Sequence, residues 1–426
     1  MSVQPLTSQS CRTLADWLRY IEQSHPIEKI ELGLQRVSDV ARRGNLAALP
    51  GKVVLIAGTN GKGTTARTLE QLLLVQGYRV GVYSSPHLLR FNERLRINGQ
   101  DVADNAWLAA FQLVEQLRQD IPLTYFEFTT LVAFAILRAE QPDFCLIEVG
   151  LGGRLDATNI VEPDISVVTT VDLDHQAFLG PDRETIGREK AGVFRPAKIA
   201  VCGDLQPPQS IAAVAESTGA KLLQLNRDYH YQQTADGWQW QGLRQQRHQL
   251  PLPQVPMQNV ATSLTVLEQL EVLPDSELLQ QEISRLCLPG RMQWLRQQPA
   301  VLLDVAHNPQ SAAYLAAQLQ RLKPGYRRVY ALVGMLKDKD LTQALLPLTT
   351  CVDEWHLVSL PGVRGAASEL LAAALQGVAP AARAVQHPEL AEAYRQVLAT
   401  AAQQDLVVVF GSFVTVAGIL ALPQEE

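Results

Sequence analysis

Short apolar segments that alternate with helical patterns predict a protein with two α/β domains. In the N-terminal half, apolar runs such as Val53–Ala57 and Ile165–Thr170 are separated by helical stretches such as Asn105–Arg118. A second series of the same kind starts near Ala300. Because strands that alternate with helices form parallel sheets covered on both faces, we expect a mainly parallel sheet in the first domain and a smaller α/β sheet in the second.

The length of the chain sets the expected number of domains. A chain of 426 residues exceeds a typical single domain. We place the boundary just after Leu288-Pro289-Gly290-Arg291, which divides the chain into residues 1–294 and 295–426. A region rich in Gln, Trp and Arg, about residues 226–249, alternates weakly and predicts a small antiparallel β excursion in the first domain.

Composition excludes several classes of protein. Hydrophobic residues make up 47% and charged residues 19% of the chain, as in an ordinary globular protein. A net charge of −6 argues against a broad nucleic-acid surface, so anionic ligands must be held by local positive groups. Five dispersed cysteines without a Cys-x-x-Cys pair argue against zinc and favour reduced thiols.

Two segments bear on targeting. The polar start, Met1–Ser10, lacks the apolar core of a signal peptide. The uncharged segment Leu406–Leu422 is shorter than the roughly 20 residues that span a bilayer. Its Gly411-Ser412 pair predicts a strand, a tight turn and a helix instead. We therefore expect a cytoplasmic protein that binds neither a membrane nor nucleic acid.

The most informative motif is the glycine-rich turn Gly58–Thr65, between an apolar run and a helical stretch. Glycines let backbone N–H groups turn inward, and the helix start adds unpaired donors and the positive end of a dipole. Lys62 can reach the outer phosphates of a nucleotide. The turn departs from the usual P-loop pattern, because Ile56 and Gly63 stand where glycine and Ser or Thr are usual. We predict ATP binding rather than a plain strand-to-helix turn. The expected ATP contacts here are Thr59, Asn60, Gly61, Lys62, Gly63 and Thr64.

Polar residues follow other predicted strands of the first domain. Glu148 ends an apolar run beside the nucleotide turn, which is where a Mg²⁺-directing acid is expected. Ser84-Ser85-Pro86-His87 follows another strand and places a hydroxyl at the same sheet edge. His175 can be a general base, a metal ligand or a loop histidine, and the pattern alone favours the last. Lys190 lies on a helical stretch, where most lysines are solvated.

The second domain carries a similar arrangement of polar residues. Asp304 ends its first strand, and His307-Asn308-Pro309 opens the following helix. His307 or Asn308 can accept an anionic ligand at this helix N-terminus, but the same residues equally suit capping with Pro just inside the helix. Arg291, beside Gly290, can project onto a phosphate. Ligands of α/β folds sit at the carboxyl ends of strands, where these motifs fall.

Taken in order, these motifs resemble the folylpolyglutamate synthase family of the Mur ligase superfamily. The resemblance runs from about Asp16 to Leu420. It implies an N-terminal P-loop ATPase-like domain that binds ATP and pterin, and a C-terminal Rossmann-like domain that contributes to ATP and glutamate binding. The segments that carry it are Gly58–Thr65, Ser84–Arg94, Glu148–Asp156, Leu173–His175, Arg188–Gly192, Pro289–Arg291 and Asp304–Pro309.

The resemblance also implies roles for single residues. Lys190 matches the lysine that family members carbamylate to N6-carboxylysine, which turns a cation into a carboxylate-like group. His307 and Ser412 match positions on the glutamate side. Further ATP contacts would be Asn259, Arg291 and Asp304. The Mg²⁺ ligands would be Ser85, Glu148 and His175. The catalytic residues would be Lys62, Glu148, His175 and Lys190.

Two segments, Leu123–Glu127 and Leu155–Ala157, resemble those of bifunctional family members, where they line a dihydropteroate site with a segment like Glu31–Leu34. Glu31 replaces an aspartate of a relative and Val305 replaces a common glycine, but neither change removes a functional side chain. The residues expected at the pterin are Glu31, Leu32, Gly33, Leu34, Thr124, Tyr125, Phe126, Glu127, Leu155, Asp156 and Ala157.

The implied activity is an ATP-dependent, Mg²⁺-requiring ligase that joins L-glutamate to dihydropteroate, and to tetrahydrofolate and its polyglutamates, as a monomer. A synthase of polyglutamates alone is one alternative. A Mur-type ligase of a cell-wall precursor is another, although Leu123–Glu127 and the lack of a separate UDP-binding domain argue against it. A P-loop ATPase module for a protein partner is disfavoured by a second domain that bears Asp304 and His307.

Overall fold

The computed structural model describes residues 7–27 and 29–423, so the first six residues of the polar N-terminus lie outside the described part. The described chain forms two compact units. The first runs to Val171 and resumes from Leu179 to Leu286, and the second combines Asp172–Phe178 with the chain from Cys287 onward. The boundary expected after residue 294 thus falls a few residues inside the second unit. That residues 172–178 group with the second unit was not expected from the sequence, which placed them in the first domain.

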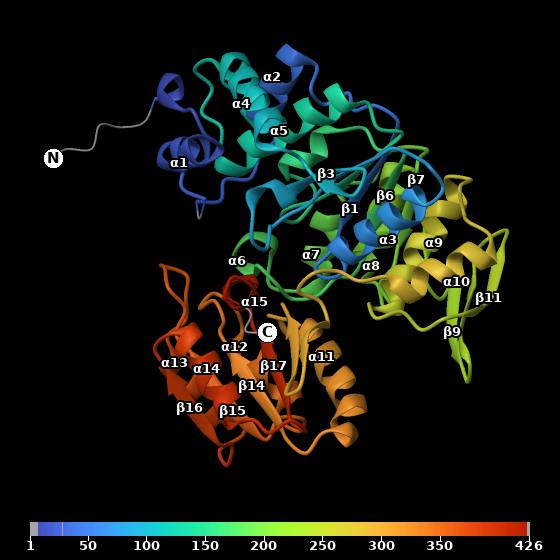
Figure 1. Cartoon of the computed structure of the whole chain (residues 1–426). Helices are drawn as coiled ribbons and strands as arrows, with labels where there is room; N and C mark the ends of the chain where they lie inside the picture. The colour runs from blue at the N-terminus through green and yellow to red at the C-terminus, as the bar shows by residue number, and fades with distance from the viewer. Residues whose placement is uncertain (1–6, 28, 424–426) are drawn as a thin grey trace. The chain divides into compact units, whose positions relative to one another are not determined.

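The first unit is built on an eight-stranded sheet in the order β4-β3-β2-β5-β1-β6-β7-β8 (Figure 1). Strands β2, β5, β1, β6, β7 and β8 pair in parallel in that order. At the edge next to β2, strands β3 and β4 add antiparallel pairs. The predicted mainly parallel sheet is therefore confirmed. The strands are β1 (Lys52–Ala57), β2 (Val80–Tyr83), β3 (Leu95–Ile97), β4 (Gln100–Asp101), β5 (Phe144–Glu148), β6 (Ile165–Val168), β7 (Ile199–Cys202) and β8 (Lys221–Gln224).

Helices cover both faces of this sheet because successive strand residues point to opposite faces and both sets are apolar. Along β1, Leu55 belongs to one buried cluster, while Val54 and Ile56 belong to the other. The helices of this unit are α1 (Leu14–Ser24), α2 (Gln35–Gly44), α3 (Lys62–Leu74), α4 (Asp104–Arg118), α5 (Tyr125–Glu140), α7 (Arg183–Ala191), α8 (Gln209–Thr218), α9 (Met257–Gln269) and α10 (Ser276–Arg285).

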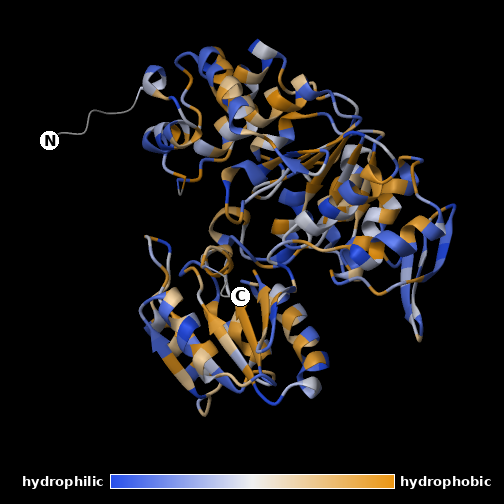
Figure 2. Ribbon diagram, viewed as in Figure 1, coloured by the Kyte–Doolittle hydropathy of each residue, from blue (hydrophilic) through white to orange (hydrophobic). Residues whose placement is uncertain are grey.

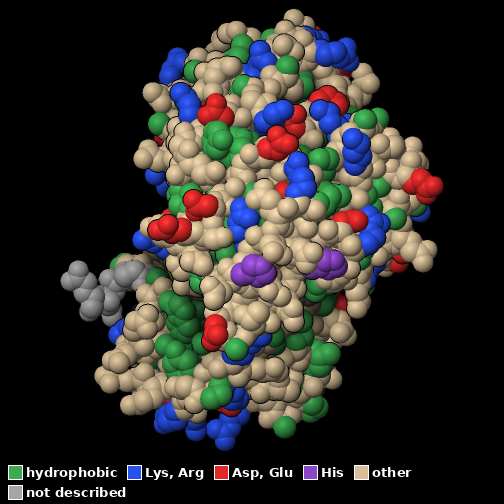
Figure 3. Space-filling view, turned by 90° about the vertical axis from the view of Figure 1, so that its right-hand side faces the viewer, with side chains coloured by type: hydrophobic (Ala, Val, Ile, Leu, Met, Phe, Trp, Pro, Cys, Tyr) green, Lys and Arg blue, Asp and Glu red, His purple; other side chains and the backbone are tan. Residues whose placement is uncertain are grey.

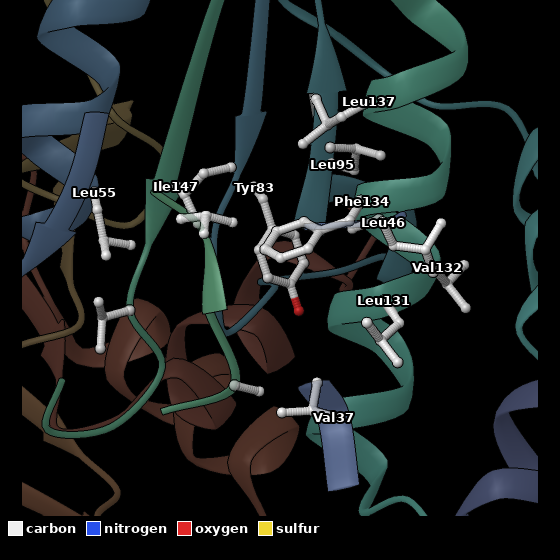
Figure 4. Packing of buried hydrophobic residues seen from close by; sticks show 14 of the residues in the cluster. Val37, Leu46, Leu55, Tyr83, Leu95, Leu131, Val132, Phe134, Leu137 and Ile147 are labelled. Carbon is white, nitrogen blue, oxygen red and sulfur yellow. The ribbon is translucent and has the colours of Figure 1, made fainter. Parts of the chain in front are cut away.

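Figure 4 shows how helix α5 packs on the strands that lead to the candidate site. The ring of Tyr83 meets that of Phe134 edge to face, with centroids 6.2 Å apart. The Tyr83 hydroxyl forms a hydrogen bond with Thr130 Oγ1 at 3.1 Å. Because protein interiors are closely packed, these contacts with α5 hold the ends of β2 and β5 in place.

The predicted β excursion is a three-stranded antiparallel sheet in the order β11-β10-β9. Trp238 and Trp240 alternate along its middle strand, and both are buried in the core beneath α9. These two indoles anchor the small sheet to the first unit. Its strands are β9 (His230–Thr234), β10 (Gly237–Gln241) and β11 (Gln246–Leu250).

The second unit contains a six-stranded sheet in the order β12-β13-β17-β14-β15-β16. It is parallel except for β12, which pairs antiparallel with β13. Its central strands are the apolar ribbons visible in Figure 2. The strands are β12 (Gln293–Gln297), β13 (Ala300–Asp304), β14 (Val329–Val333), β15 (Glu354–Val358), β16 (Ala384–His387) and β17 (Leu406–Phe410). The helices are α11 (Pro309–Leu322), α12 (Leu341–Leu345), α13 (Ser368–Val378), α14 (Leu390–Thr400) and α15 (Phe413–Leu420).

The uncharged segment Leu406–Leu422 folds as β17, a turn at Gly411 and α15, as predicted. Within the described residues, no helix combines the length and apolarity needed to cross a membrane. On the face drawn in Figure 3, basic and acidic side chains are interspersed rather than gathered by sign. This agrees with a ligand site built from a few local charges.

Candidate functional site

The glycine-rich turn lies between the end of β1 and the start of α3, and its glycines are required by close contacts. A Cβ atom on Gly58 would lie 1.8 Å from Thr169 Oγ1. One on Gly61 would lie 2.5 Å from Asn259 Oδ1, and Gly61 also has a φ of +91°. Side chains are therefore excluded at both positions. The turn is clamped between the end of β6 and helix α9, which carries the predicted contact Asn259.

Hydrogen bonds hold the turn in place. The Thr59 amide donates to Thr170 O at 2.7 Å, and the Asn60 amide donates to Thr170 Oγ1 at 3.1 Å. Lys62 Nζ donates to Gly58 O at 3.1 Å and lies 4.0 Å from a carboxylate oxygen of Glu148. The Lys62 ammonium thus lies next to the turn, and an anionic ligand can replace the carbonyl of Gly58 as its partner.

Glu148 and Ser85, two of the predicted Mg²⁺ ligands, follow neighbouring strands of the sheet. Glu148 is buried at the end of β5, in register with Ile56 of β1. Ser85 lies just after β2, which pairs with β5 on its other side. In the described part of the chain, no group of three or more His, Cys, Asp or Glu residues can hold a metal. Mg²⁺ needs no such cage, because it usually takes one or two carboxylates and fills its shell with waters and phosphate oxygens.

Lys190 is buried on α7, which excludes the solvated position that its helical pattern favoured. The turn that follows Glu148 packs against its backbone: a Cβ atom on Gly153 would lie 2.9 Å from Lys190 O. The next residue, Arg154, donates its amide to Glu189 O at 2.8 Å. Lys190 therefore lies against the turn that follows Glu148 rather than in solvent.

The three segments expected at the pterin come together in the first unit. The Gly33 amide donates to Leu155 O at 3.3 Å. Phe126, on the first turn of α5, packs its ring on Gly150, where a Cβ atom would lie 2.5 Å from Cζ. Glu31 and Glu127 are joined by Arg36, which sequence reasoning missed. The predicted pterin residues therefore lie next to the turn that begins at Glu148.

Asp156 shapes one of these segments from within. Its carboxylate accepts hydrogen bonds from Leu151 N at 2.7 Å, Thr158 N at 3.0 Å and Thr158 Oγ1 at 2.6 Å. Burial raises the pKa of Asp156, while the hydrogen bonds from Thr158 and Leu151 lower it. By accepting hydrogen bonds from residues on either side of it, Asp156 fixes the course of the chain between Glu148 and Ala157.

A buried arginine lies beside the same helix start. Arg94 Nε donates to His87 Nδ1 at 2.9 Å, and the guanidinium stacks near the rings of Phe91 and Tyr125, at 5.4 Å and 5.8 Å. Burial, helped by the charge of Arg94, lowers the pKa of His87 to about 4, so this histidine is neutral near pH 7. The resemblance covered Arg94, but only the fold shows that it is buried against the predicted pterin residue Tyr125.

In the second unit, Asp304 ties the strand end to the segment that carries Arg291. Its carboxylate accepts hydrogen bonds from Met292 N at 3.0 Å and Ala306 N at 2.8 Å. Burial raises the pKa of Asp304, and the charge of Arg291 opposes that rise. The Arg291 guanidinium lies over the ring of Phe413, 5.8 Å from its centroid. The two predicted ATP contacts of this unit are thus neighbours.

Two other polar residues of this unit cap helices. Asn308 accepts a hydrogen bond from Ser311 N at 3.0 Å and precedes Pro309, so the capping alternative for this segment is confirmed. Ser412 caps α15 by accepting from Thr415 N at 3.0 Å. These caps set the directions of two helices that follow the adjacent parallel strands β13 and β17.

Residues 172–178 complete a polar cluster in the second unit. Asp174 accepts hydrogen bonds from Lys339 Nζ at 2.7 Å and Asn308 Nδ2 at 3.4 Å, and His307 Nε2 lies 3.8 Å away. Lys339 Nζ also lies 3.5 Å from the predicted metal ligand His175. Burial alone would raise the pKa of Asp174, but His307 and the cation of Lys339 hold it well below its usual range.

A cavity of about 450 Å³ adjoins this cluster. Asp174, His175, Asn308 and Lys339 line it together with Gln343. Sequence reasoning missed Lys339 because its charged neighbours, in Lys337-Asp338-Lys339-Asp340, are typical of a solvated loop. The cavity is large enough for a small polar molecule and offers both signs of charge.

Comparison with known proteins identifies the class. The Mur ligase middle domain matches residues 56–267, and the Mur ligase glutamate ligase domain matches residues 290–413. These matches cover the glycine-rich turn and the cluster around Asp174. The fold and site therefore define an ATP-dependent ligase of the Mur type.

Full-length relatives narrow this class. The chain is 44% identical to the dihydrofolate synthase/folylpolyglutamate synthase of Escherichia coli strain K12, over 97% of this chain and 96% of the relative. The structure of E. coli FolC in complex with DHPP and ADP has a TM-score of 0.92 and covers 96% of this chain and 97% of that one, at 44% identity. A bifunctional synthase with Mn, AMPPNP and L-glutamate bound has a TM-score of 0.90 at 47% identity, over 98% of this chain and 99% of that one. The chain belongs to the dihydrofolate synthase/folylpolyglutamate synthase family, as its motifs predicted.

Proposed function

We propose that this enzyme uses ATP to join L-glutamate to dihydropteroate, and also to tetrahydrofolate and its polyglutamates. The observation that carries the proposal is the meeting of three segments, Glu31–Leu34, Thr124–Glu127 and Leu155–Ala157, beside the strand end at Glu148. The phosphate turn at Lys62 lies at the same edge of the sheet, 4.0 Å from that carboxylate. An acid held by these segments therefore lies next to the phosphates that activate it.

The reaction needs two steps. An oxygen of the substrate carboxylate attacks the γ-phosphorus of ATP, the bond to the β-γ bridging oxygen breaks, and ADP leaves. The amine of glutamate then attacks the acyl carbon, the bond to the phosphate oxygen breaks, and the nitrogen loses a proton as phosphate departs. The activation step is the same for both acids, so a single ATP site serves both.

The residues of the turn lower the barrier to the first step. The substrate carboxylate and the triphosphate are both anionic and repel each other. Lys62, at the mouth of the turn, offsets this repulsion and stabilises charge on the transferred group. Glu148 and Ser85 would hold Mg²⁺, which would supply Lewis-acid stabilisation of negative charge on the transferred group. Asn259, against Gly61, holds the turn in shape.

Other predicted residues enter the proposal by their family positions. Lys190 as N6-carboxylysine places an anionic group in its buried position on α7, and His175 is the third proposed metal ligand. In the second unit, Arg291 and Asp304 would contact ATP. His307 and Ser412 would lie on the glutamate side. The chemistry of the cluster around Asp174 supports this, because glutamate carries charges of both signs.

We further propose that the enzyme works as a monomer in the cytoplasm. Its five cysteines form no disulfide, in keeping with a reducing compartment. Gel filtration of the purified protein with light scattering gives its mass, and a value of about twice that of the chain would contradict the monomer.

The experiment that tests the activity is a coupled ADP-release assay with ATP, Mg²⁺ and L-glutamate, followed by mass analysis of the products. Dihydropteroate and tetrahydrofolate are compared as the acid. We expect turnover with both, each product gaining one glutamate. Turnover with tetrahydrofolate alone would reduce the proposal to a polyglutamate synthase, and turnover with neither would reject it.

A further inference from the structure

Arg36 links two of the segments proposed to hold the pterin, and nothing in the sequence pattern pointed to it. It lies on the first turn of α2, directly after the segment Glu31–Leu34. Its Nη1 lies 3.1 Å from Glu31 Oε2, and its Nη2 donates to Glu31 O at 3.3 Å. Its Nε lies 3.3 Å from both carboxylate oxygens of Glu127, on α5.

Glu127 is in turn tied to the start of its helix. Its carboxylate accepts a hydrogen bond from the Thr124 amide at 2.7 Å, and the Thr124 hydroxyl accepts one from the Glu127 amide at 3.1 Å. Only 4% of the Glu127 side chain is exposed. A carboxylate buried to this degree needs a positive partner, and Arg36 supplies it with Nη2 3.3 Å from Glu127 Oε1.

We propose that Arg36 is a positioning residue that sets the affinity for dihydropteroate by holding Glu31–Leu34 against the Thr124–Glu127 turn. The inference rests on the proposed function, because it needs these segments to be the pterin site. Arg36 itself reaches carboxylates and a carbonyl of the protein, so it acts on the ligand through the two segments. Its hydrogen bonds and ion pairs in the described part of the chain reach Glu31 and Glu127 and not the glycine-rich turn, so we expect the KM for ATP to be unaffected.

The shape of the side chain matters as much as its charge. A guanidinium presents N–H groups in a planar fork that contacts two carboxylates and a carbonyl at once. A lysine ammonium is a compact charge on a flexible stem and cannot span Glu31 and Glu127 in the same way. Arg36→Lys is therefore expected to retain the charge balance while it loosens the link between the segments.

The test is steady-state kinetics on Arg36→Met and Arg36→Lys in the full-length enzyme, with Arg42→Met as the matched control. Arg42 lies on the same helix with 71% of its side chain exposed, and its partner is Asp39. We expect the KM for dihydropteroate to rise roughly tenfold or more in Arg36→Met and by a smaller factor in Arg36→Lys. The KM values for ATP and glutamate and the kcat at saturating dihydropteroate should stay within about threefold of wild type, and the control should match wild type.

A double-mutant cycle with Glu127→Gln tests the route of the effect. If Arg36 acts through Glu127, the rise in KM of Arg36→Met with Glu127→Gln is smaller than the product of the single effects. An unchanged KM for dihydropteroate, or an equal loss in all kinetic constants, would overturn the inference. If Arg36→Met does not fold, Arg36→Lys decides by the same criteria. A wild-type enzyme that fails to use dihydropteroate would reject the proposed function itself.

Discussion

The two units place polar groups at the same kind of position, the carboxyl ends of parallel strands, by different physical means. In the first unit the site depends on missing side chains: Gly58 and Gly61 let the backbone approach Thr169 and Asn259. In the second unit the loop that follows β13 carries polar side chains instead, and one of them, Asn308, caps α11 by accepting a hydrogen bond from Ser311 N.

The difference determines what each unit tolerates. The backbone forms the phosphate turn of the first unit. Its cation, Lys62, donates to the carbonyl of Gly58 and lies 4.0 Å from a carboxylate oxygen of Glu148, so it is weakly held. The cation of the second unit, Lys339, is held by a direct ion pair with Asp174 at 2.7 Å. A lysine that is weakly held is available for a ligand, and one that is tightly paired stabilises the fold. Substitutions at Lys62, at Lys339 and at two glycines test this contrast.

The largest effect is expected for Lys62→Met. Loss of a preorganised positive group at the transferred phosphate should lower kcat by about a hundredfold or more. The thermal midpoint should change less than in Lys339→Met, because the ion pair of Lys62 with Glu148 is long, at 4.0 Å. Initial rates of ADP release and a melting curve give both quantities. A variant with normal kcat, or one whose loss of rate followed a loss of folded protein, would break the contrast.

Lys339→Met should act on stability instead. Only 7% of the Lys339 side chain and 12% of that of Asp174 are exposed, so loss of the cation leaves a buried charge. The expected cost is about 3 kcal/mol in the free energy of unfolding of the second unit. Hydrogen exchange along β13, β14 and β17 localises the loss. The exposed Lys337→Met serves as control.

The stability lost in Lys339→Met should depend on pH through the protonation of Asp174. Its pKa in the folded protein is lowered by His307 and Lys339 against the effect of burial. Because the pKa of Asp174 is lower in the folded than in the unfolded protein, where it is about 4, ionised Asp174 stabilises the fold above pH 4. This contribution is lost as the pH falls from about 4 towards the pKa of the folded protein. Without the cation of Lys339, the pKa of the buried Asp174 carboxylate is higher, so protonation relieves the cost in the variant. The stability difference between wild type and Lys339→Met should thus be largest at pH 7 and shrink as the pH falls to 4 and below. A difference that stays constant from pH 7 to pH 3 would contradict a role for this ion pair.

The smallest effects are expected for alanine substitutions of two glycines in the first unit, which separate the cost of backbone strain from the cost of a steric contact. Gly61 and Gly77 have similar φ values of +91° and +86°, but a Cβ atom on Gly77 would meet nothing within 4 Å. Gly77→Ala should cost about 1 kcal/mol of stability, and Gly61→Ala about 2 kcal/mol or more, with a raised KM for ATP. Chemical denaturation and ATP kinetics measure both. Equal costs with unchanged ATP kinetics would mean that Asn259 moves aside freely.

Much of the fold could be predicted because it depends on local patterns. Buried strands such as β1 and β17 are apolar runs, and the strand–turn–helix at Gly58–Thr65 needs glycine whatever lies around it. By contrast, β12 and β16 were missed. Both are short edge strands whose residues are mostly exposed or half-buried, so they carry no apolar signal and exist only because a neighbouring strand offers its hydrogen bonds.

The candidate site divides along the same line. The sequence by itself determined the glycine-rich turn, the acid at Glu148 and the family, since these rest on residue type at fixed spacing. Only the tertiary structure decided that Lys190 and Lys339 are buried and that Arg36 joins two distant segments. The physical reason is that a charged side chain looks the same in the sequence whether it meets water or a partner. Its partner comes from another part of the chain, and packing alone brings the two together.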